Sequence, residues 1–120
     1  MKVIKGGFNR LLMEYLNCNN GRYVFTPNDS HLNAFSTIHG GVTASLVDIV
    51  TSIEIYNIKK QYGVSVDLGV QYLKPLISEF RLEPKVEKIG KALVFTSCSI
   101  YNEKNELAAL GRHIKMLSNK

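Results

Sequence analysis

The sequence contains few cysteines, no long apolar run and no recognisable secretion signal. Its two cysteines, Cys18 and Cys98, stand far apart and outside any CxxC or Cys/His spacing. This excludes a disulfide framework and a zinc knuckle, and it indicates two free thiols. No run of about 18 apolar residues is present that would span a membrane. Residues 1–7 are interrupted by lysine and glycine before the apolar core of a signal peptide develops, so we expect an intracellular, cytoplasmic protein.

Positive charge is present but is not concentrated in one place. The chain has a formal net charge of +5, yet its lysines are scattered singly apart from the pair Lys59 and Lys60. No aromatic interleaving or RNA-binding motif accompanies them, so the sequence gives little support for a nucleic-acid partner. Coenzyme A, which carries phosphates, is an equally good anionic partner.

Length and composition fit one compact domain. Hydrophobic residues make up 45% of the chain and charged residues 21%, which is ordinary for a globular protein and excludes disorder. The 120 residues leave room for one core, so we expect a single domain over residues 1–120. Residues 1–20 would form its N-terminal helix and lead-in.

Apolar periodicity predicts a long central helix preceded by short elements. Residues 8–16 have the spacing of a short amphipathic helix. Residues 22–26 form a β-rich run that Pro27 stops, and residues 31–33 are expected to be a second short extended piece. Residues 40–59 are predicted to form a helix that is apolar over most of its circumference. Such a helix must be buried by the rest of the fold.

After residue 63 the apolar period changes from about 3.6 to about 2, which predicts strands. Four strands are expected, at residues 64–72, 81–88, 92–101 and 106–117. Pro75 ends the first of them, and turn-forming residues separate the others, so they are interpreted as an antiparallel meander. The pattern therefore predicts an α+β fold, in which a curled antiparallel β-sheet is wrapped around the long central helix.

The most informative motif lies where the long helix begins. His39, Gly40 and Gly41 stand directly before the apolar stretch, and Asp48 is a lone carboxylate within it. Two glycines at a helix start leave backbone N–H groups free to meet a ligand oxygen, and the helix dipole favours negative charge there. This pattern indicates a binding or catalytic site.

Together these features resemble the hotdog-fold acyl-CoA thioesterases, and more narrowly the phenylacetate-degradation type and the animal thioesterase superfamily member 2 type. The resemblance runs in order from about residue 22 to residue 117, and it rests on residues 33–48, 63–67, 71–75, 90–91, 95–97 and 111–113. It implies a hotdog fold, homodimers joined edge to edge that often pair into homotetramers, and hydrolysis of acyl-CoA without a metal or other cofactor.

The motif also indicates how such chemistry would work. Thioester hydrolysis needs a stabilised oxyanion and a delivered water; the Gly40 N–H suits the first need and Asp48, as general base or nucleophile, the second. Eight residues at about 1.5 Å each separate the two by roughly 12 Å along one helix. They cannot act on one carbonyl within a single chain. We therefore expect a two-fold axis to bring Gly40 of one chain to Asp48 of the other.

The resemblance assigns supporting roles to further residues. Asn33 matches a position whose side chain helps to hold the attacking water, and His39 matches the position beside the carbonyl-binding glycine. Ser65 matches a strand serine that orients the acid. Ser36 stands where many relatives have glycine, which alters the local turn at the mouth of the acyl pocket.

Substrate contacts are expected at both ends of the ligand. Gly41 would lie beside the bound thioester, and an apolar acyl pocket would be lined by Val42, Leu46 and the strand after residue 63. That lining suits medium to long fatty or aryl acyl groups. The phosphates of CoA would meet basic residues of the last two strands and their turn: Lys88, Lys91, Arg112, His113 and Lys115.

The candidate site residues also have alternative interpretations as purely structural residues. Asp48 shares a helix face with two serines, which the pattern alone would class as a polar stripe. Asn33 is an ordinary turn residue, and the helix-start glycines suit close packing. Ser65 and Asp67 fit the polar face of a half-exposed strand, and the basic residues fit a charged solvent face.

An acyl-CoA thioesterase is the leading functional hypothesis. Within the same fold, the alternative is a hydratase or dehydratase that acts on acyl thioesters. From another class, a non-catalytic protein that binds acyl-CoA or RNA would use the basic charge and would not need Asp48.

Overall fold

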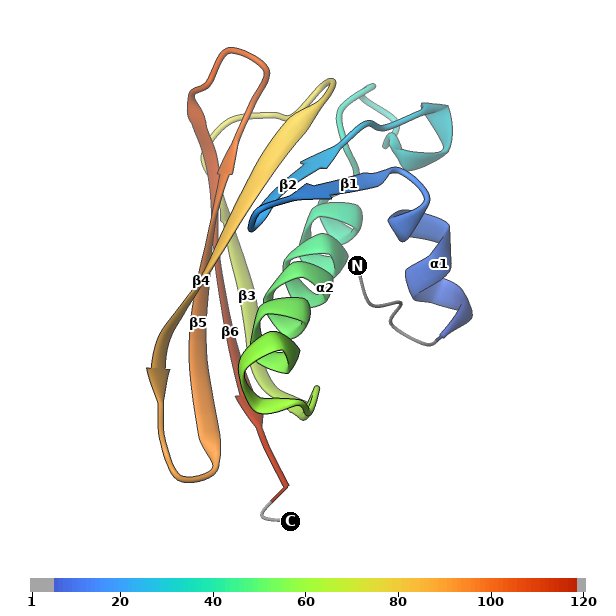
Figure 1. Cartoon of the computed structure of the whole chain (residues 1–120). Coiled ribbons are helices and arrows are strands. Elements are labelled where there is room, and N and C mark those ends of the chain that lie inside the picture. The colour runs from blue at the N-terminus through green and yellow to red at the C-terminus, as the bar shows by residue number, and fades with distance from the viewer. Residues whose placement is uncertain (1–5, 119–120) are drawn as a thin grey trace.

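A computed structural model describes residues 6–118, and in it one curved sheet packs against one long helix (Figure 1). The elements in chain order are α1 (Gly7–Met13), β1 (Leu16–Asn19), β2 (Arg22–Phe25), the 3₁₀ helix η1 (Asp29–His31), α2 (Gly40–Lys59), β3 (Val64–Tyr72), β4 (Phe80–Ile89), β5 (Leu93–Tyr101) and β6 (Leu107–Met116). The six strands are antiparallel in the order β1-β2-β4-β5-β6-β3. The predicted α+β arrangement, a curled antiparallel sheet around a central helix, is confirmed.

Helix α2 has the predicted bounds, and a distinct local conformation marks each of its ends. At its start the Nδ1 atom of His39 accepts a hydrogen bond from the Gly41 N–H at 2.9 Å, which caps the first turn. At its end Lys60 adopts a left-handed conformation (φ 59°), which stops the helical hydrogen bonds.

The concave face of the sheet buries α2. Leu46, Val47 and Val50 are fully buried against the inner face of the sheet, where Leu82 and Ile100 join the same core. Each such aliphatic side chain contributes about 1.5–3 kcal/mol by leaving water. The position of α2 against the sheet is therefore fixed by packing along most of its length.

The interpretation of the last four strands as one meander is wrong in one respect. Strands β4, β5 and β6 do form consecutive hairpins, but β3 pairs with β6 instead of β4. Residues 73–79, which separate β3 from β4, are longer than a tight hairpin turn and contain Pro75. Leu76 anchors this connection by being buried, and its carbonyl accepts a hydrogen bond from the Ile38 N–H at 2.7 Å.

The N-terminal elements also differ from the prediction. The helix predicted over residues 8–16 ends at Met13, and Leu16 instead starts β1, which pairs with β2. Asn20 and Gly21 form the turn between them with positive φ angles of 53° and 78°, so a two-residue hairpin competes with the helix for this segment.

The short extended piece predicted at residues 31–33 differs at its first residue, because His31 is the last residue of η1, whereas Leu32 is extended. Asn28 caps this turn by accepting a hydrogen bond from the Ser30 N–H at 2.9 Å, and its own N–H donates to His31 Nδ1 at 3.0 Å. Local side-chain hydrogen bonds therefore override the extended pattern at His31. Only an isolated bridge between Leu32 and Ile38 has strand pairing there.

Three further expectations concern the N-terminal lead-in, membrane-spanning helices and the two cysteines. The lead-in over residues 1–5 lies outside the described residues. Within residues 6–118, no helix combines the length and apolarity needed to cross a membrane. Cys18 and Cys98 are free thiols, as expected, and burial raises the pKa of Cys98 to about 12.

Strand β3 stands last in the sheet order, so one of its backbone edges has no strand partner within residues 6–118. The strand is nine residues long, and several of its apolar side chains are exposed: Val64, Val66, Leu68 and Tyr72. A long apolar edge strand is a template for pairing with another chain.

Candidate active site

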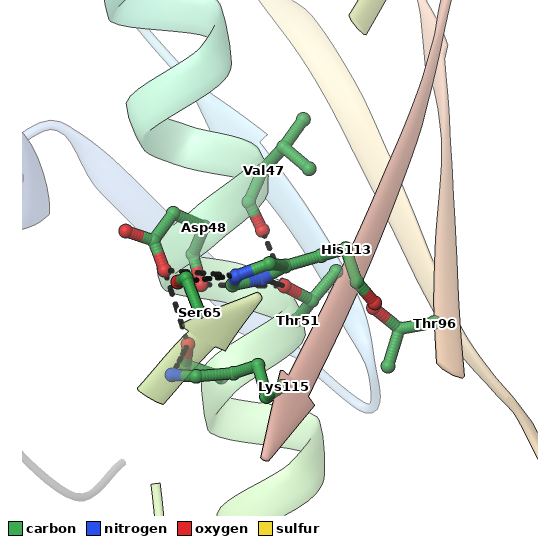
Figure 2. Close-up of polar contacts among 8 residues, drawn as sticks. Val47, Asp48, Thr51, Ser65, Thr96, His113 and Lys115 are labelled. Atoms are coloured by element: carbon green, nitrogen blue, oxygen red, sulfur yellow. Dashed lines mark hydrogen bonds and ion pairs between the residues drawn. The ribbon is translucent and has the colours of Figure 1, made fainter. Parts of the chain in front are cut away.

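Asp48 lies midway along α2 at the rim of a cluster of polar side chains (Figure 2). Its side chain is 44% exposed, and its Oδ1 atom accepts a hydrogen bond from Ser52 Oγ at 3.3 Å. The buried Lys115 Nζ in turn donates to Ser52 Oγ at 2.7 Å. Burial lowers the pKa of Lys115 below its ordinary value, and the charge of Asp48 partly offsets this shift. The carboxylate is thus accessible on one side and surrounded by hydroxyl and ammonium groups on the other.

His113 is the buried centre of this cluster. Its side chain is 0% exposed; its Nε2 lies 2.7 Å from Ser65 Oγ and its Nδ1 lies 2.8 Å from Thr51 Oγ1. The same Nε2 is 3.8 Å from Asp48 Oδ1. Burial lowers the pKa of His113, although the Asp48 charge acts in the opposite direction. The ring is therefore neutral at physiological pH, and it connects β3, β6 and α2.

A bulge in β3 decides which side chains of that strand reach the cluster. Ser65 pairs with Lys115, but Asp67 pairs with Ile114, so Val66 is an extra residue in the ladder. In a regular strand with no bulge, Ser65 and Asp67 would share one face, because they are two residues apart. The bulge leaves Ser65 against His113 on the inner face and puts Asp67 on the outer face, where its Oδ2 accepts from Arg112 Nε at 2.7 Å. The expected polar face of β3 is therefore divided.

Gly40 starts α2 with a backbone N–H that donates to no other group among the described residues. Its carbonyl accepts a hydrogen bond from the Tyr72 hydroxyl at 2.5 Å. A Cβ added at Gly40 would lie 3.2 Å from that hydroxyl, which is tighter than ordinary packing. The close approach of Tyr72 therefore depends on glycine at this position.

Gly40 and Asp48 open into two different cavities of the chain. Gly40 lines a cavity of about 320 Å³ together with Asn33 and Tyr72. Asp48 lines another cavity of about 190 Å³ together with Ser65 and Lys115. This separation agrees with the roughly 12 Å that eight helical residues impose.

The side chain of Asn33 organises the loop before α2. Its Oδ1 accepts hydrogen bonds from the N–H groups of Phe35 at 2.8 Å and Thr37 at 3.2 Å, and its Nδ2 donates to Thr37 Oγ1 at 2.7 Å. Ser36, within the same loop, has a positive φ of 62°, a conformation that glycine adopts at lower cost. The contacts give Asn33 the plainer role of a turn residue, and its contact with a water stays a prediction.

The helix-start residues His39 and Gly41 are paired with each other. A Cβ at Gly41 would lie 3.1 Å from His39 Nδ1, so the cap described above requires a small residue there. Both residues line a third cavity, of about 640 Å³, between α1 and the start of α2. Gly41 therefore stands at a cavity wall, and its contact with a substrate stays a prediction.

The basic residues expected to meet CoA phosphates are in quite different places. His113 is fully buried beneath α2, so it is not available to a phosphate. The side chains of β6 alternate between the two faces of the sheet, and residue 113 points inward. Lys115 is buried for the same reason. The sequence pattern did not show which residues of this strand face inward. Arg112 points outward but is paired with Asp67, and its side chain is 60% exposed. Lys91 is exposed in the β4–β5 turn, toward the end of the sheet where α2 ends (Figure 1).

The largest of the three cavities has a different lining from the acyl pocket that was expected. Val42 lines it, but Leu46 is fully buried in the core and lines none of the three cavities. The apolar wall comes instead from α1 and the residue pair that follows it, through Phe8, Leu11, Leu12 and Tyr15. The amphipathic N-terminal helix therefore contributes an exposed apolar face to this cavity.

Three residues of the site were not identified as such from the sequence. Thr51 contacts His113 from α2, Ser52 links Asp48 to Lys115, and Tyr72 covers Gly40. Thr51 and Ser52 stand three and four residues after Asp48, the spacing that puts side chains on one helix face. That spacing was the available signal. Within residues 6–118, no group of three or more His, Cys, Asp or Glu side chains is arranged to hold a metal ion.

The structure has a curled sheet around a helix that begins with a free backbone N–H and carries a half-exposed carboxylate. This geometry defines a hotdog-fold thioesterase type of domain. Residues 35–109 match the family model described as the thioesterase superfamily, and the chain belongs to that family.

The relatives agree with this assignment. Acyl-coenzyme A thioesterase 13 of Homo sapiens is 39% identical over 95 residues, which are 76% of this chain and 68% of the relative. Among solved structures, thioesterase superfamily member 2 from Mus musculus superposes with a TM-score of 0.86 at 31% identity, covering 93% of this chain and 88% of that one. The zebra fish thioesterase superfamily member 2 gives a TM-score of 0.83 at 29% identity, covering 95% and 88%.

Proposed function

We propose that this chain hydrolyses acyl-CoA thioesters to free acids and CoA at a site shared by two copies. The observation that carries the proposal is the separation of its two reactive groups: the free Gly40 N–H and the Asp48 carboxylate line different cavities of one chain. Each cavity holds half of what thioester hydrolysis needs. The names of the relatives support the activity, since acyl-coenzyme A thioesterase 13 is similar over 76% of this chain.

The proposed reaction uses a water and no covalent intermediate. Asp48 of one copy removes a proton from the water as its oxygen bonds to the thioester carbonyl carbon. The Gly40 N–H of the other copy, at the positive end of α2, stabilises the oxyanion that forms. When the tetrahedral intermediate collapses, the carbon–sulfur bond breaks and the CoA thiolate takes the proton back from Asp48.

A dimer through β3 would bring these groups together. The edge of β3 has no partner within the described residues, and its exposed apolar side chains give an edge-to-edge contact a favourable area. A two-fold axis across this edge would pair each strand with its own copy and form two equivalent sites. Further pairing of dimers into tetramers belongs to the same proposal and is measured by light scattering.

The acyl group is proposed to occupy the cavity of about 640 Å³ beside Gly41 and Val42. Its lining by Phe8, Leu11 and Tyr15 suits an apolar chain or an aromatic ring. The phosphates of CoA are proposed to meet Lys91 and Arg112, which are both exposed. His39 would lie beside the thioester and Asn33 would hold the attacking water.

The test of activity is release of CoA thiol from acyl-CoAs of several chain lengths and from an aryl acyl-CoA. Wild-type hydrolysis that Asp48→Asn abolishes would support the proposal. An absence of hydrolysis across the whole panel would contradict it. Hydration of crotonyl-CoA by the same protein would point to the hydratase alternative.

Mixing two inactive variants tests the shared site directly. Asp48→Asn removes the base, and Gly40→Val crowds the N–H and Tyr72 with a side chain, so a mixed dimer retains one intact site and one doubly altered site. Random exchange of subunits should therefore restore about one quarter of wild-type activity. Gly7→Val is a matched control, because a Cβ at that helix-start glycine meets nothing within 4 Å. No recovery on mixing, with exchange verified by mass spectrometry of tagged copies, would contradict the shared site.

A further inference from the structure

We propose that Thr51, on the side of His113 away from the cavity, is a positioning residue that sets the direction of the Ser65 hydrogen bond and so orients the attacking water at Asp48. The inference rests on the proposed thioester hydrolysis. It is carried by the chain of contacts Thr51, His113 and Ser65, which crosses α2, β6 and β3 in Figure 2.

The first step is the direction of the bond between Thr51 and the ring. Thr51 Oγ1 has one hydrogen, and it donates to the Val47 carbonyl at 2.7 Å, the hydrogen bond that a threonine makes within its own helix. A second carbonyl within reach, that of Asp48, is farther away at 3.3 Å. Thr51 Oγ1 therefore accepts from His113, and His113 Nδ1 carries the hydrogen.

The second step follows from the neutral state of the ring. A neutral imidazole with hydrogen on Nδ1 has a bare Nε2, which can only accept. Ser65 Oγ lies 2.7 Å from that Nε2, so the Ser65 hydroxyl donates to the ring. The carboxylate of Asp48 is an acceptor at 3.8 Å and does not compete for this position.

The third step concerns the cavity that Ser65 and Asp48 share. Once its hydrogen points at His113, Ser65 presents only oxygen lone pairs to the cavity. A water between Ser65 and Asp48 then donates one hydrogen to each and turns its own lone pair outward, toward an incoming carbonyl carbon. With the opposite tautomer, Ser65 would accept from the ring and donate into the cavity, where it would compete with the water for the Asp48 carboxylate.

The other two histidines provide an internal reference. The Nδ1 atom of His31 accepts from the Asn28 N–H at 3.0 Å, and that of His39 accepts from the Gly41 N–H at 2.9 Å. When neutral, both therefore carry hydrogen on Nε2. His113 alone of the three histidines in the sequence should have the Nδ1–H form.

The experiment combines ring ¹⁵N NMR with kinetics on wild type, Thr51→Val and the conservative Thr51→Ser. In wild type at pH 8, two histidines should show the Nε2–H pattern of shifts and His113, assigned by its loss in His113→Gln, the Nδ1–H pattern. Thr51→Val removes the acceptor with little change of shape. It should convert the His113 signal toward the Nε2–H pattern and lower kcat at least tenfold with KM and dimer mass unchanged. Thr51→Ser should restore both.

The outcomes separate this inference from the function on which it rests. An Nε2–H pattern for His113 in wild type would overturn the inference whatever the activity. A Thr51→Val variant that changes the tautomer and keeps the wild-type kcat would also overturn it, while thioester hydrolysis itself would stand. Wild type without any hydrolysis would overturn the proposed function, and the catalytic role of Thr51 with it, even if the tautomer is as stated.

Discussion

Ser65 and Asp67 are two residues apart on β3, yet they belong to different parts of the molecule. Ser65 contacts the buried His113 on the inner face, whereas Asp67 forms an exposed ion pair with Arg112 on the outer face. One extra residue, Val66, produces this difference. The comparison teaches that two similar polar residues reach the inner cluster or the outer surface through a local irregularity of the backbone. The inner and outer faces of the sheet can therefore be tested against each other.

The largest contrast is expected between the two aspartates. Asp48→Asn should lower kcat for acyl-CoA hydrolysis by about 10²–10⁴-fold, because a general base contributes that much. Asp67→Asn removes only an exposed ion pair with Arg112 and should leave kcat nearly unchanged. Steady-state thiol release measures both. Equal losses in the two variants would break the distinction between the faces.

A large effect on stability is expected from matched leucines on the two faces. Leu82 is fully buried on the inner face, so Leu82→Ala should cost about 2–5 kcal/mol of unfolding free energy. Leu110, on the outer face, is 38% exposed, and Leu110→Ala should cost distinctly less. Urea unfolding followed by circular dichroism measures both. A Leu110→Ala cost equal to that of Leu82→Ala would indicate that the outer face is also covered in solution.

Two glycines sharpen the same contrast at a smaller scale. A Cβ at Gly111 would lie 2.9 Å from the buried Val47 side chain, so Gly111→Ala should cost about 1–3 kcal/mol through overpacking. The three atoms nearest to a Cβ at Gly69 all belong to the guanidinium of Arg112, the far end of an exposed side chain. Gly69→Ala should displace Arg112 from Asp67 and cost distinctly less, because an exposed ion pair contributes little to stability. Thermal unfolding of both variants checks the order.

The smallest effect on the free energy of unfolding at neutral pH is expected from protonation of His113. Its pKa is lowered in the folded state, so between its ordinary value of 6.5 and the folded value the unfolded chain binds more protons. Stability is therefore fully present above pH 6.5 and is lost as the pH falls toward the folded pKa. His31 shifts in the same direction. His113→Gln should flatten the fall without removing it, which unfolding midpoints between pH 8 and pH 5 will measure.

Much of the fold could be predicted because the residues that start and end its long helix and first long strand are neighbours of those elements in the sequence. The bounds of α2 and β3 follow from the His-Gly-Gly start, Gly63 and the change of period, and the structure has both elements at the predicted residues. The pairing of β3 with β6 was not predictable in this way, because it is decided by contacts between strands far apart in the chain. The hairpin of β1 and β2 was missed because the amphipathic pattern continues past the end of α1.

For the candidate site, the roles of the residues stay predictions, and only their positions can be compared with the structure. Gly40 and Asp48 were identified from their own neighbours in the sequence, and their separation followed from helix geometry. The buried position of His113 depends on which residues of β6 face inward, and that parity is not visible in a strand with small residues on both faces. Thr51 was missed because its partner is 62 residues away and the direction of a hydroxyl bond depends on both.

The free edge of β3 has a consequence for how the proposed enzyme would behave on dilution. If each site takes one half from each of two copies, a lone chain turns over no substrate. Below the dissociation constant of the pair, the number of sites falls with the square of the total concentration, by mass action. The rate of hydrolysis per chain would then depend on how much of the protein a cell makes. A partner that binds the edge of β3 would inactivate both sites at once.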